Sequence, residues 1–251
     1  MRGAAYDSGA TVLIRGEEAV LVDALGSRAD AEALRRFVDA DLGKRVRFVL
    51  CTHYFSDHVA ALGLFPEAEI VAQRFFRHTW DLELHRSAEE RSFFVAPTVL
   101  VDSGLTLRWG RFTLDAFHVP GHTMSTLAID VPEADLLFVG DTVVGRIGYF
   151  LYTSPQLLAE GLETLERRGR ARLLASHGGV EDGGAIAAAR QYLASFESKT
   201  RRARAERDGA AAVRGITLAE CLAPGLTPTD FEEVFHRRNL DTALDRGADG
   251  A

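Results

Sequence analysis

The sequence predicts a single α/β domain, and three observations lead to this fold class. Short runs of aliphatic and β-branched residues alternate along the chain with segments of helical periodicity. The 251 residues are 47% hydrophobic and 26% charged, which are the proportions of an ordinary globular protein. No low-complexity or linker-like stretch interrupts the chain, so we expect one domain over residues 1–251.

The first part of the chain predicts a strand-helix-strand unit that follows a hairpin. Two apolar runs, residues 11–14 and 19–22, are separated by four polar or glycine residues and form the expected hairpin. Apolar residues at helical spacing predict a helix over residues 28–40, and residues 46–51 return as a β-rich run. This order is typical of a sheet with a helix on one face.

The remaining elements continue this alternation. We expect a short helix over residues 59–65, strands over residues 70–72, 105–107, 112–114, 126–131, 136–139 and 173–175, and a helix over residues 156–168. An aromatic-rich helical insert is predicted at about residues 73–92, and a helical C-terminal segment from about residue 184.

Histidine and aspartate residues follow several of the predicted strands. They are His53, Asp57, His58, His122, Asp141 and His177. Because open α/β sheets place ligands at the carboxyl ends of their strands, we expect these side chains to gather at one edge. Imidazole and carboxylate together suit zinc, iron or manganese better than calcium or magnesium.

The order and spacing of these residues resemble the metallo-β-lactamase superfamily. The matching motifs are His-x-x-x-Asp-His at 53–58, Pro-Gly-His-Thr at 120–123, Gly-Asp-Thr at 140–142 and His-Gly at 177–178, within residues 11–179. The resemblance implies a four-layer αββα sandwich with a metal site between two sheets. It also implies hydrolysis of an ester, thioester, lactone, amide or phosphodiester.

The resemblance further implies how the ligands divide between two metal ions. One ion would take His53, His122 and a bridging Asp141, and the other would take Asp57, His58, Asp141 and His177. The chain departs from the family's usual His-x-His-x-Asp-His pattern, because Phe55 stands where a ligand belongs. We therefore expect one or two zinc ions, or iron or manganese, with tighter binding at the second site.

The function implied by this resemblance is metal-dependent hydrolysis of a small ester, thioester or lactone by a metal-activated water. Asp57 would coordinate or orient that nucleophile, which makes it the expected catalytic residue. Two other readings remain open. One is an iron-dependent sulfur dioxygenase, which would use the site containing His53 and His122, and the other is a non-catalytic protein that has lost one or both metals.

Several further residues leave alternatives open. The aromatic residues of the insert and its flank form either a wall of the substrate pocket or part of a core or dimer contact; they are Phe75, Phe76, Trp80, Phe93 and Phe94. Arg146 either meets an anionic substrate or belongs to a loop that packs its aromatic residues inward. For His118 we expect a supporting or structural role. His78, His85 and His236 lie in expected helical segments and receive no chemical role.

Charge and cysteine content limit the possible partners and location. Twenty-nine Lys and Arg against 36 Asp and Glu give a net charge of −7, which argues against a nucleic-acid partner. The Arg-rich stretch at residues 199–207 is expected to be a solvated helix face. We expect a small-molecule substrate, no membrane segment, a possible homo-oligomer and, with only Cys51 and Cys221 and no signal-like start, a cytoplasmic protein.

Overall fold

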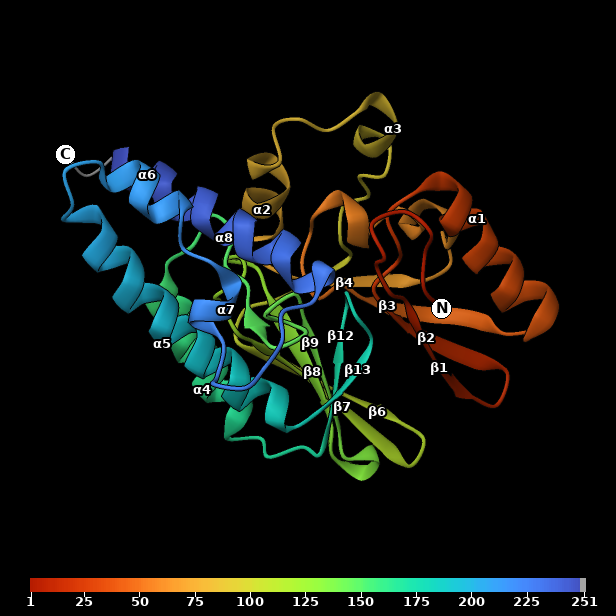
Figure 1. Cartoon of the computed structure of the whole chain (residues 1–251). Coiled ribbons are helices and arrows are strands. Elements are labelled where there is room, and N and C mark those ends of the chain that lie inside the picture. The colour runs from red at the N-terminus through yellow and green to blue at the C-terminus, as the bar shows by residue number, and fades with distance from the viewer. Residues whose placement is uncertain (249–251) are drawn as a thin grey trace.

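Two β-sheets lie face to face in the computed structural model, and helices cover their outer faces (Figure 1). The structure describes residues 1–248. The first sheet has the order β1-β2-β3-β4-β5, and the second has the order β13-β12-β9-β8-β7-β6. In the first sheet only β1 and β2 pair antiparallel, whereas in the second only β9 and β12 pair parallel.

The strands are short and their bounds are as follows. The first sheet contains β1 (Thr11–Arg15), β2 (Glu18–Val22), β3 (Arg45–Leu50), β4 (Glu69–Gln73) and β5 (Val99–Val101). The second contains β6 (Gly104–Trp109), β7 (Phe112–His118), β8 (Leu127–Val131), β9 (Leu136–Gly140), β12 (Arg172–Ala175) and β13 (Val180–Asp182). A separate hairpin is formed by β10 (Val143–Val144) and β11 (Ile147–Gly148).

Helices lie between and after these strands. They are α1 (Arg28–Arg36), α2 (Phe76–Leu82), α3 (Ala88–Arg91), α4 (Pro155–Glu166), α5 (Gly184–Arg204), α6 (Gly209–Arg214), α7 (Leu218–Cys221) and α8 (Asp230–Ala248). A π-helical turn, Phe37–Asp41, extends α1, and 3₁₀ turns span Ser56–His58, Leu62–Leu64 and Pro132–Ala134. The helix expected over residues 59–65 is therefore wrong, because only one 3₁₀ turn forms there.

Alternating side chains of the strands create the layers. In β2, Leu21 points into a core shared with Leu34 of α1, while Val20 points into the core between the sheets. In β9, Phe138 belongs to the same intersheet core, whereas Leu137 joins a core with α4 and α5. Three stacked hydrophobic cores separate four layers, and the predicted αββα sandwich is confirmed.

Polar residues at the helix starts fix where helices begin. The Ser27 hydroxyl accepts a hydrogen bond from the Asp30 backbone at the start of α1, at 3.1 Å. Ser154 caps α4 in the same way, and Pro155 occupies the first turn, where its missing N–H costs nothing. Among residues 1–248, no helix has the length and apolar character that crossing a membrane requires.

Candidate metal centre

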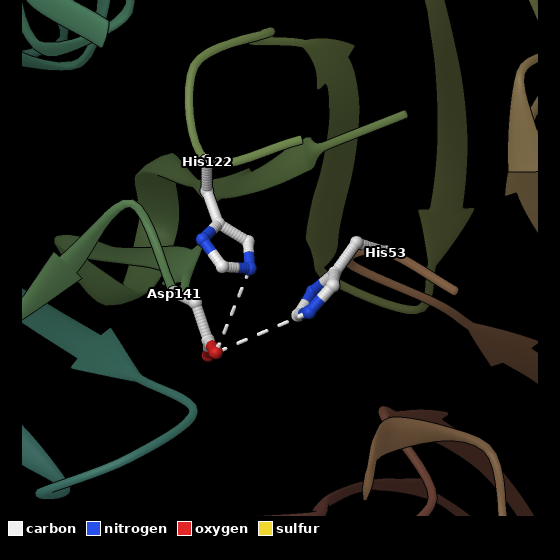
Figure 2. A group of neighbouring side chains, drawn as sticks. All are labelled: His53, His122 and Asp141. Carbon is white, nitrogen blue, oxygen red and sulfur yellow. Dashed lines mark ion pairs between the residues drawn. The ribbon is translucent and has the colours of Figure 1, made fainter. Parts of the chain in front are cut away.

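The six predicted ligands come together at one edge of the sandwich. His53 follows β3, and Asp57 and His58 lie in the 3₁₀ turn after it. His122 follows β7, Asp141 follows β9 and His177 follows β12. Figure 2 shows His53 and His122 pointing toward the Asp141 carboxylate from separate segments.

A single oxygen of Asp141 lies at the centre of this group. Its Oδ2 atom is 3.2 Å from His177 Nε2, 3.6 Å from His58 Nε2, 3.8 Å from His122 Nε2 and 3.9 Å from His53 Nε2. Because four imidazoles aim the same nitrogen at one carboxylate, Asp141 occupies the position of a bridging ligand.

Two sets of donors share this carboxylate. His53, His122 and Asp141 form one set whose ligand atoms lie within 4.8 Å of one another. Asp57, His58 and His177 form the other, with Asp57 Oδ2 at 3.3 Å from His177 Nε2 and 3.6 Å from His58 Nε2. With Asp141, the second set offers four donors and the first offers three. The structure thus brings together the ligands that the sequence motifs single out.

The buried polar atoms of these sets fit a divalent metal ion. Within residues 1–248, His53 Nε2, His58 Nε2, both ring nitrogens of His122 and Asp141 Oδ1 are buried without a hydrogen-bond partner. Buried polar atoms in proteins are nearly always paired, so a group of unpaired imidazole and carboxylate atoms in one place fits a site that holds a cation. Imidazole and carboxylate donors are the ligands that zinc, iron and manganese accept.

The charges in the centre divide the histidines into two kinds. Burial lowers the pKa of His177, but the Asp141 charge and hydrogen bonds to Asp141 and Asp57 outweigh burial and raise it to about 10. Burial lowers the pKa of His122 to about 4, since the Asp141 charge is too weak an opposing influence. Protons therefore gather on the second donor set, where a metal cation would replace them.

The two carboxylates remain ionised for a related reason. Burial would raise the pKa of Asp57, but the positive charge of His58 outweighs it and holds that pKa well below its ordinary value. Burial also opposes ionisation of Asp141, and the charges of His177 and His58 hold its pKa far below normal. Both carboxylates are therefore available as charged ligands at neutral pH.

Asp23, at the end of β2, supports the centre from behind and was not among the predicted site residues. Its carboxylate accepts hydrogen bonds from the Thr52 backbone at 2.7 Å, the Thr52 hydroxyl at 2.8 Å and the Ser176 hydroxyl at 2.8 Å. The fourth partner is His58 Nδ1 at 3.1 Å. One buried carboxylate thus joins β2 to the ends of β3 and β12. Its only sequence signal is an acidic residue directly after a buried strand.

Three of the four histidines are oriented through their Nδ1 atoms. His58 Nδ1 donates to Asp23, and His177 Nδ1 donates to the Tyr6 backbone carbonyl at 2.9 Å. His53 Nδ1 lies 3.1 Å from the Thr52 hydroxyl, which itself donates to Asp23. These Nδ1 contacts turn Nε2 of each ring toward the centre, which is the orientation that metal ligation requires.

Phe55 lies beside the first donor set. Its ring is only 5% exposed and packs edge-on against His53 and His122, with centroid separations of 5.3 and 5.7 Å. A phenyl ring offers no lone pair, so it fills the space next to these imidazoles without coordinating. The first set consequently keeps three donors and an open position.

A cavity of about 150 Å³ opens onto the centre. Asp57, His122, Asp141 and His177 form its inner surface. The remaining lining residues come from distant segments, and the sequence motifs gave no signal for them; they are Tyr6, Phe55, Ser56, Glu83, Tyr149, Leu151, Tyr152 and Arg238.

Four of the five aromatic residues of the insert and its flank belong to a core or pack against it. Trp80 and Phe93 are buried in the core that α1 shares with the first sheet, and Phe76 and Phe94 pack against it. Phe75 is 38% exposed, and none of the five lines the cavity. The insert instead contributes Glu83, whose carboxylate accepts hydrogen bonds from the backbone and hydroxyl of Ser56 at 2.9 and 2.7 Å.

Arg146 and His118, whose roles the sequence alone did not decide, are bound to other parts of the protein. Arg146 is held by Glu232 at 2.5 Å and by the Thr227 carbonyl, so the structure gives it a protein partner rather than a place in the cavity. His118 Nε2 donates to the Met124 carbonyl at 2.8 Å, which stabilises the loop that carries His122.

The three histidines without an assigned role lie away from the centre. His78 is exposed on α2, and His236 is buried in α8 between Tyr192 and the Ile216 carbonyl. The helical placement of His85 is wrong, because it lies in the turn between α2 and α3. None of the three lines the metal cavity.

Comparisons with known proteins find several relatives of this chain. Hydroxyacylglutathione hydrolase of Thermosynechococcus vestitus is 29% identical over 133 residues, covering 51% of this chain and 47% of that protein. The human mitochondrial persulfide dioxygenase ETHE1 is 27% identical over 135 residues, covering 51% and 44%. The human acyl-coenzyme A thioesterase MBLAC2 is 29% identical over 168 residues, covering 55% and 60%. The chain thus spans about half the length of these curated relatives.

Solved structures show the same fold. The B3 metallo-β-lactamase BLEG-1 superposes with a TM-score of 0.63 and 21% identity, covering 76% of this chain and 96% of that one. A metallo-β-lactamase from Pontibacter korlensis gives 0.63 and 20%, covering 74% and 87%. The family model of the metallo-beta-lactamase superfamily matches residues 6–198, a range that includes all six predicted ligands. The chain therefore belongs to the metallo-β-lactamase superfamily.

Proposed function

We propose that the protein is a metal-dependent hydrolase of a small ester, thioester or lactone. The observation that carries this proposal is the convergence of four imidazole Nε2 atoms on Asp141 Oδ2, with Asp57 Oδ2 3.3 Å from His177 Nε2, beside a cavity. A bound divalent metal supplies a hydroxide nucleophile at neutral pH and polarises the scissile oxygen.

The protein's own side chains would place the nucleophile and the substrate. Asp57 lines the cavity, its side chain is 21% exposed, and it is ionised, so its carboxylate can accept a hydrogen bond from the attacking water and orient it. Phe55 and Tyr149 wall the cavity beside His122 and limit access of bulk water.

Zinc is the metal we propose first, with one or two ions bound and iron or manganese as substitutes. Catalytic zinc sites keep three protein ligands and an open position, which the set of His53, His122 and Asp141 provides. The other set adds a fourth donor through Asp141 and should hold its ion more tightly. We also propose a small-molecule substrate and a cytoplasmic location, since Cys51 and Cys221 are buried free thiols.

Two relatives support thioester or ester chemistry. The names hydroxyacylglutathione hydrolase and acyl-coenzyme A thioesterase both describe hydrolysis of an acyl thioester by those proteins. The similarity of this chain to both proteins favours related chemistry here. That this protein's own substrate carries an ester, thioester or lactone group is part of our proposal.

A second candidate is an iron-dependent dioxygenase acting on a persulfide. His53, His122 and Asp141 form a set of two histidines and one carboxylate, which is the ligand type of many non-haem iron oxygenases. One relative is a persulfide dioxygenase. Oxygen consumption by iron-loaded protein supplied with glutathione persulfide would favour this candidate over the hydrolase.

The test is to measure hydrolysis of four compounds, namely an acyl-glutathione, an acyl-coenzyme A, a nitrophenyl ester and a lactone. We expect hydrolysis that chelation abolishes and that zinc or manganese restores. His177→Ala should remove activity, whereas His85→Ala, which changes an exposed histidine that lines neither the cavity nor its neighbouring groove, should not. Equal turnover by the metal-free protein would refute the proposal, and failure to take up metal at all would favour a non-catalytic protein.

A further inference from the structure

Helix α8 supplies part of the active-site cavity although it lies beyond the residues that the family model matches. In Figure 1 this helix crosses in front of the sheet edges. Phe235 of α8 packs against His177 and Tyr149, with ring centroids 5.6 and 5.1 Å apart. The helix therefore touches the metal centre itself, and its next turn carries Arg238 to the cavity.

Asn239 fixes α8 to the segment that forms the cavity wall. Its side-chain oxygen accepts from the Phe150 backbone at 3.2 Å, and its amide nitrogen donates to the Gly148 carbonyl at 2.9 Å and the Tyr192 hydroxyl at 3.1 Å. These bonds hold the backbone on both sides of Tyr149. Because Asn239 is fully buried, the adjacent Arg238 extends from a fixed backbone position.

Arg238 lies where two hollows of the surface adjoin. It lines both the 150 Å³ metal cavity and an adjoining groove of about 530 Å³. Its guanidinium lies 5.2 Å from the centre of the Phe235 ring, and within residues 1–248 no carboxylate lies within 4.0 Å of it to form an ion pair. Tyr149 lines the same cavity as Arg238. Burial raises the pKa of the Tyr149 hydroxyl, and the positive charge of Arg238 opposes this shift.

The outer groove has the opposite charge. Asp241 and Asp245 of α8 line it together with His78 and Leu82 of α2. A ligand that reaches from the metal centre into this groove therefore meets a guanidinium first and two carboxylates farther out. One negative charge beside Arg238 is favourable, whereas a second negative charge in the outer groove is repelled.

We propose that Arg238 binds one carboxylate of the substrate, so that the protein selects small monoanionic esters or thioesters with an uncharged or cationic tail. This inference rests on the proposed hydrolase function. A guanidinium recognises a carboxylate through two parallel N–H donors. The fixed backbone at Asn239 reduces the entropy lost when the substrate binds.

Binding of a matched pair of unreactive probes tests the inference without turnover. Succinamate carries one carboxylate, and succinamide is its neutral counterpart. By calorimetry on the zinc-loaded protein, we expect succinamate to bind more tightly, and Arg238→Ala to weaken it about tenfold. Arg238→Lys should restore part of that loss. Arg237→Ala changes the neighbouring exposed arginine, which lines no part of the cavity, and should leave both affinities unchanged.

Hydrolysis of two nitrophenyl esters provides the second readout. Arg238→Ala should raise KM about tenfold for the monoanionic succinate ester and by much less for the neutral acetate ester. If neither ester is hydrolysed, the hydrolase function fails, but the succinamate affinities still decide the role of Arg238. Unchanged succinamate binding by Arg238→Ala, or an equal loss with Arg237→Ala, would overturn the inference.

Discussion

The ring of Phe55 packs edge-on against the imidazole of His53, with 5.3 Å between the ring centroids. The same ring lies 5.7 Å from that of His122, so it contacts both imidazoles of the first donor set. A histidine at this position would bring a third imidazole to that set. The difference between two unequal metal sites and two similar ones therefore rests on one side chain.

Phe55→His should raise metal occupancy of the first donor set. An added imidazole would give it four donors, and we expect at least about tenfold tighter binding, because even outer partners of metal ligands act on that scale. Elemental analysis after dialysis against limiting zinc measures the stoichiometry. Phe55→Leu, which keeps the position apolar, is the matched control. If the histidine variant retains no more zinc than the leucine variant, the side chain does not reach the metal.

Asp23→Asn should weaken metal binding without removing a ligand. The amide cannot accept all four hydrogen bonds that orient Thr52, Ser176 and His58, so we expect a loss of about 10-fold to 100-fold in affinity. The measurement is competition for zinc with a chromogenic chelator. Asp130→Asn is the control, because its buried carboxylate pairs with Arg170 at 2.6 Å and lines no part of the metal cavity. An equal loss of affinity in both variants would mean that Asp23 acts only through stability.

Metal affinity should increase with pH. In the metal-free protein, burial lowers the pKa of His177, but Asp141 and Asp57 outweigh burial and raise it from 6.5 to about 10. Its ion pairs therefore stabilise the metal-free fold fully below pH 6.5, and this contribution is lost as pH rises through about 10. A metal ion needs the neutral ring, so apparent affinity should rise over that window by about tenfold per pH unit for each proton displaced.

Calorimetry at pH 7 in buffers of different ionisation enthalpy counts the protons. We expect at least one proton to be released for each ion bound to the second donor set. His177→Ala should release fewer protons than the wild type, whereas His78→Ala should release the same number, since His78 lies on an exposed face of α2. Binding without proton release would show that His177 is neutral before the metal arrives.

Asn239→Leu should destabilise the protein. The substitution leaves the Phe150 N–H, the Gly148 carbonyl and the Tyr192 hydroxyl without these partners in a buried region. We expect the free energy of unfolding to fall by about 3 kcal/mol, within the range for leaving buried polar groups unpaired. Urea denaturation measures this change, and Arg237→Ala on the exposed face should alter stability by less than about 0.5 kcal/mol. Similar midpoints for both variants would contradict the role given to Asn239.

The ligand set could be predicted because its motifs follow local apolar runs, and the layered fold could be predicted because those motifs resemble a known family. Each ligand follows a short apolar strand, and the carboxyl ends of neighbouring strands meet at one edge. Asp23 obeys the same rule after β2, but a single acidic residue there has no partner nearby in sequence to mark it. Its role becomes visible only when β12 brings Ser176 beside it.

The rest of the cavity depends on contacts between distant segments. Tyr6, Glu83 and Arg238 come from the N-terminus, the insert and α8, and no spacing rule links them. The sequence does not decide the role of the aromatic insert for the same reason. A position in the core and a position in a pocket wall require the same apolar side chains. Residues 59–65 are apolar enough for a helix, yet Gly63 and the short path to β4 leave only a 3₁₀ turn.

The most direct test of a metal centre built around Asp141 is elemental analysis of the protein after zinc reconstitution and dialysis, beside Asp141→Asn. We predict one to two equivalents of zinc in the wild type and less than half of that amount in the variant, because both donor sets share this carboxylate. Zinc content no higher in the wild type than in Asp141→Asn would contradict the metal centre and the hydrolase function that depends on it.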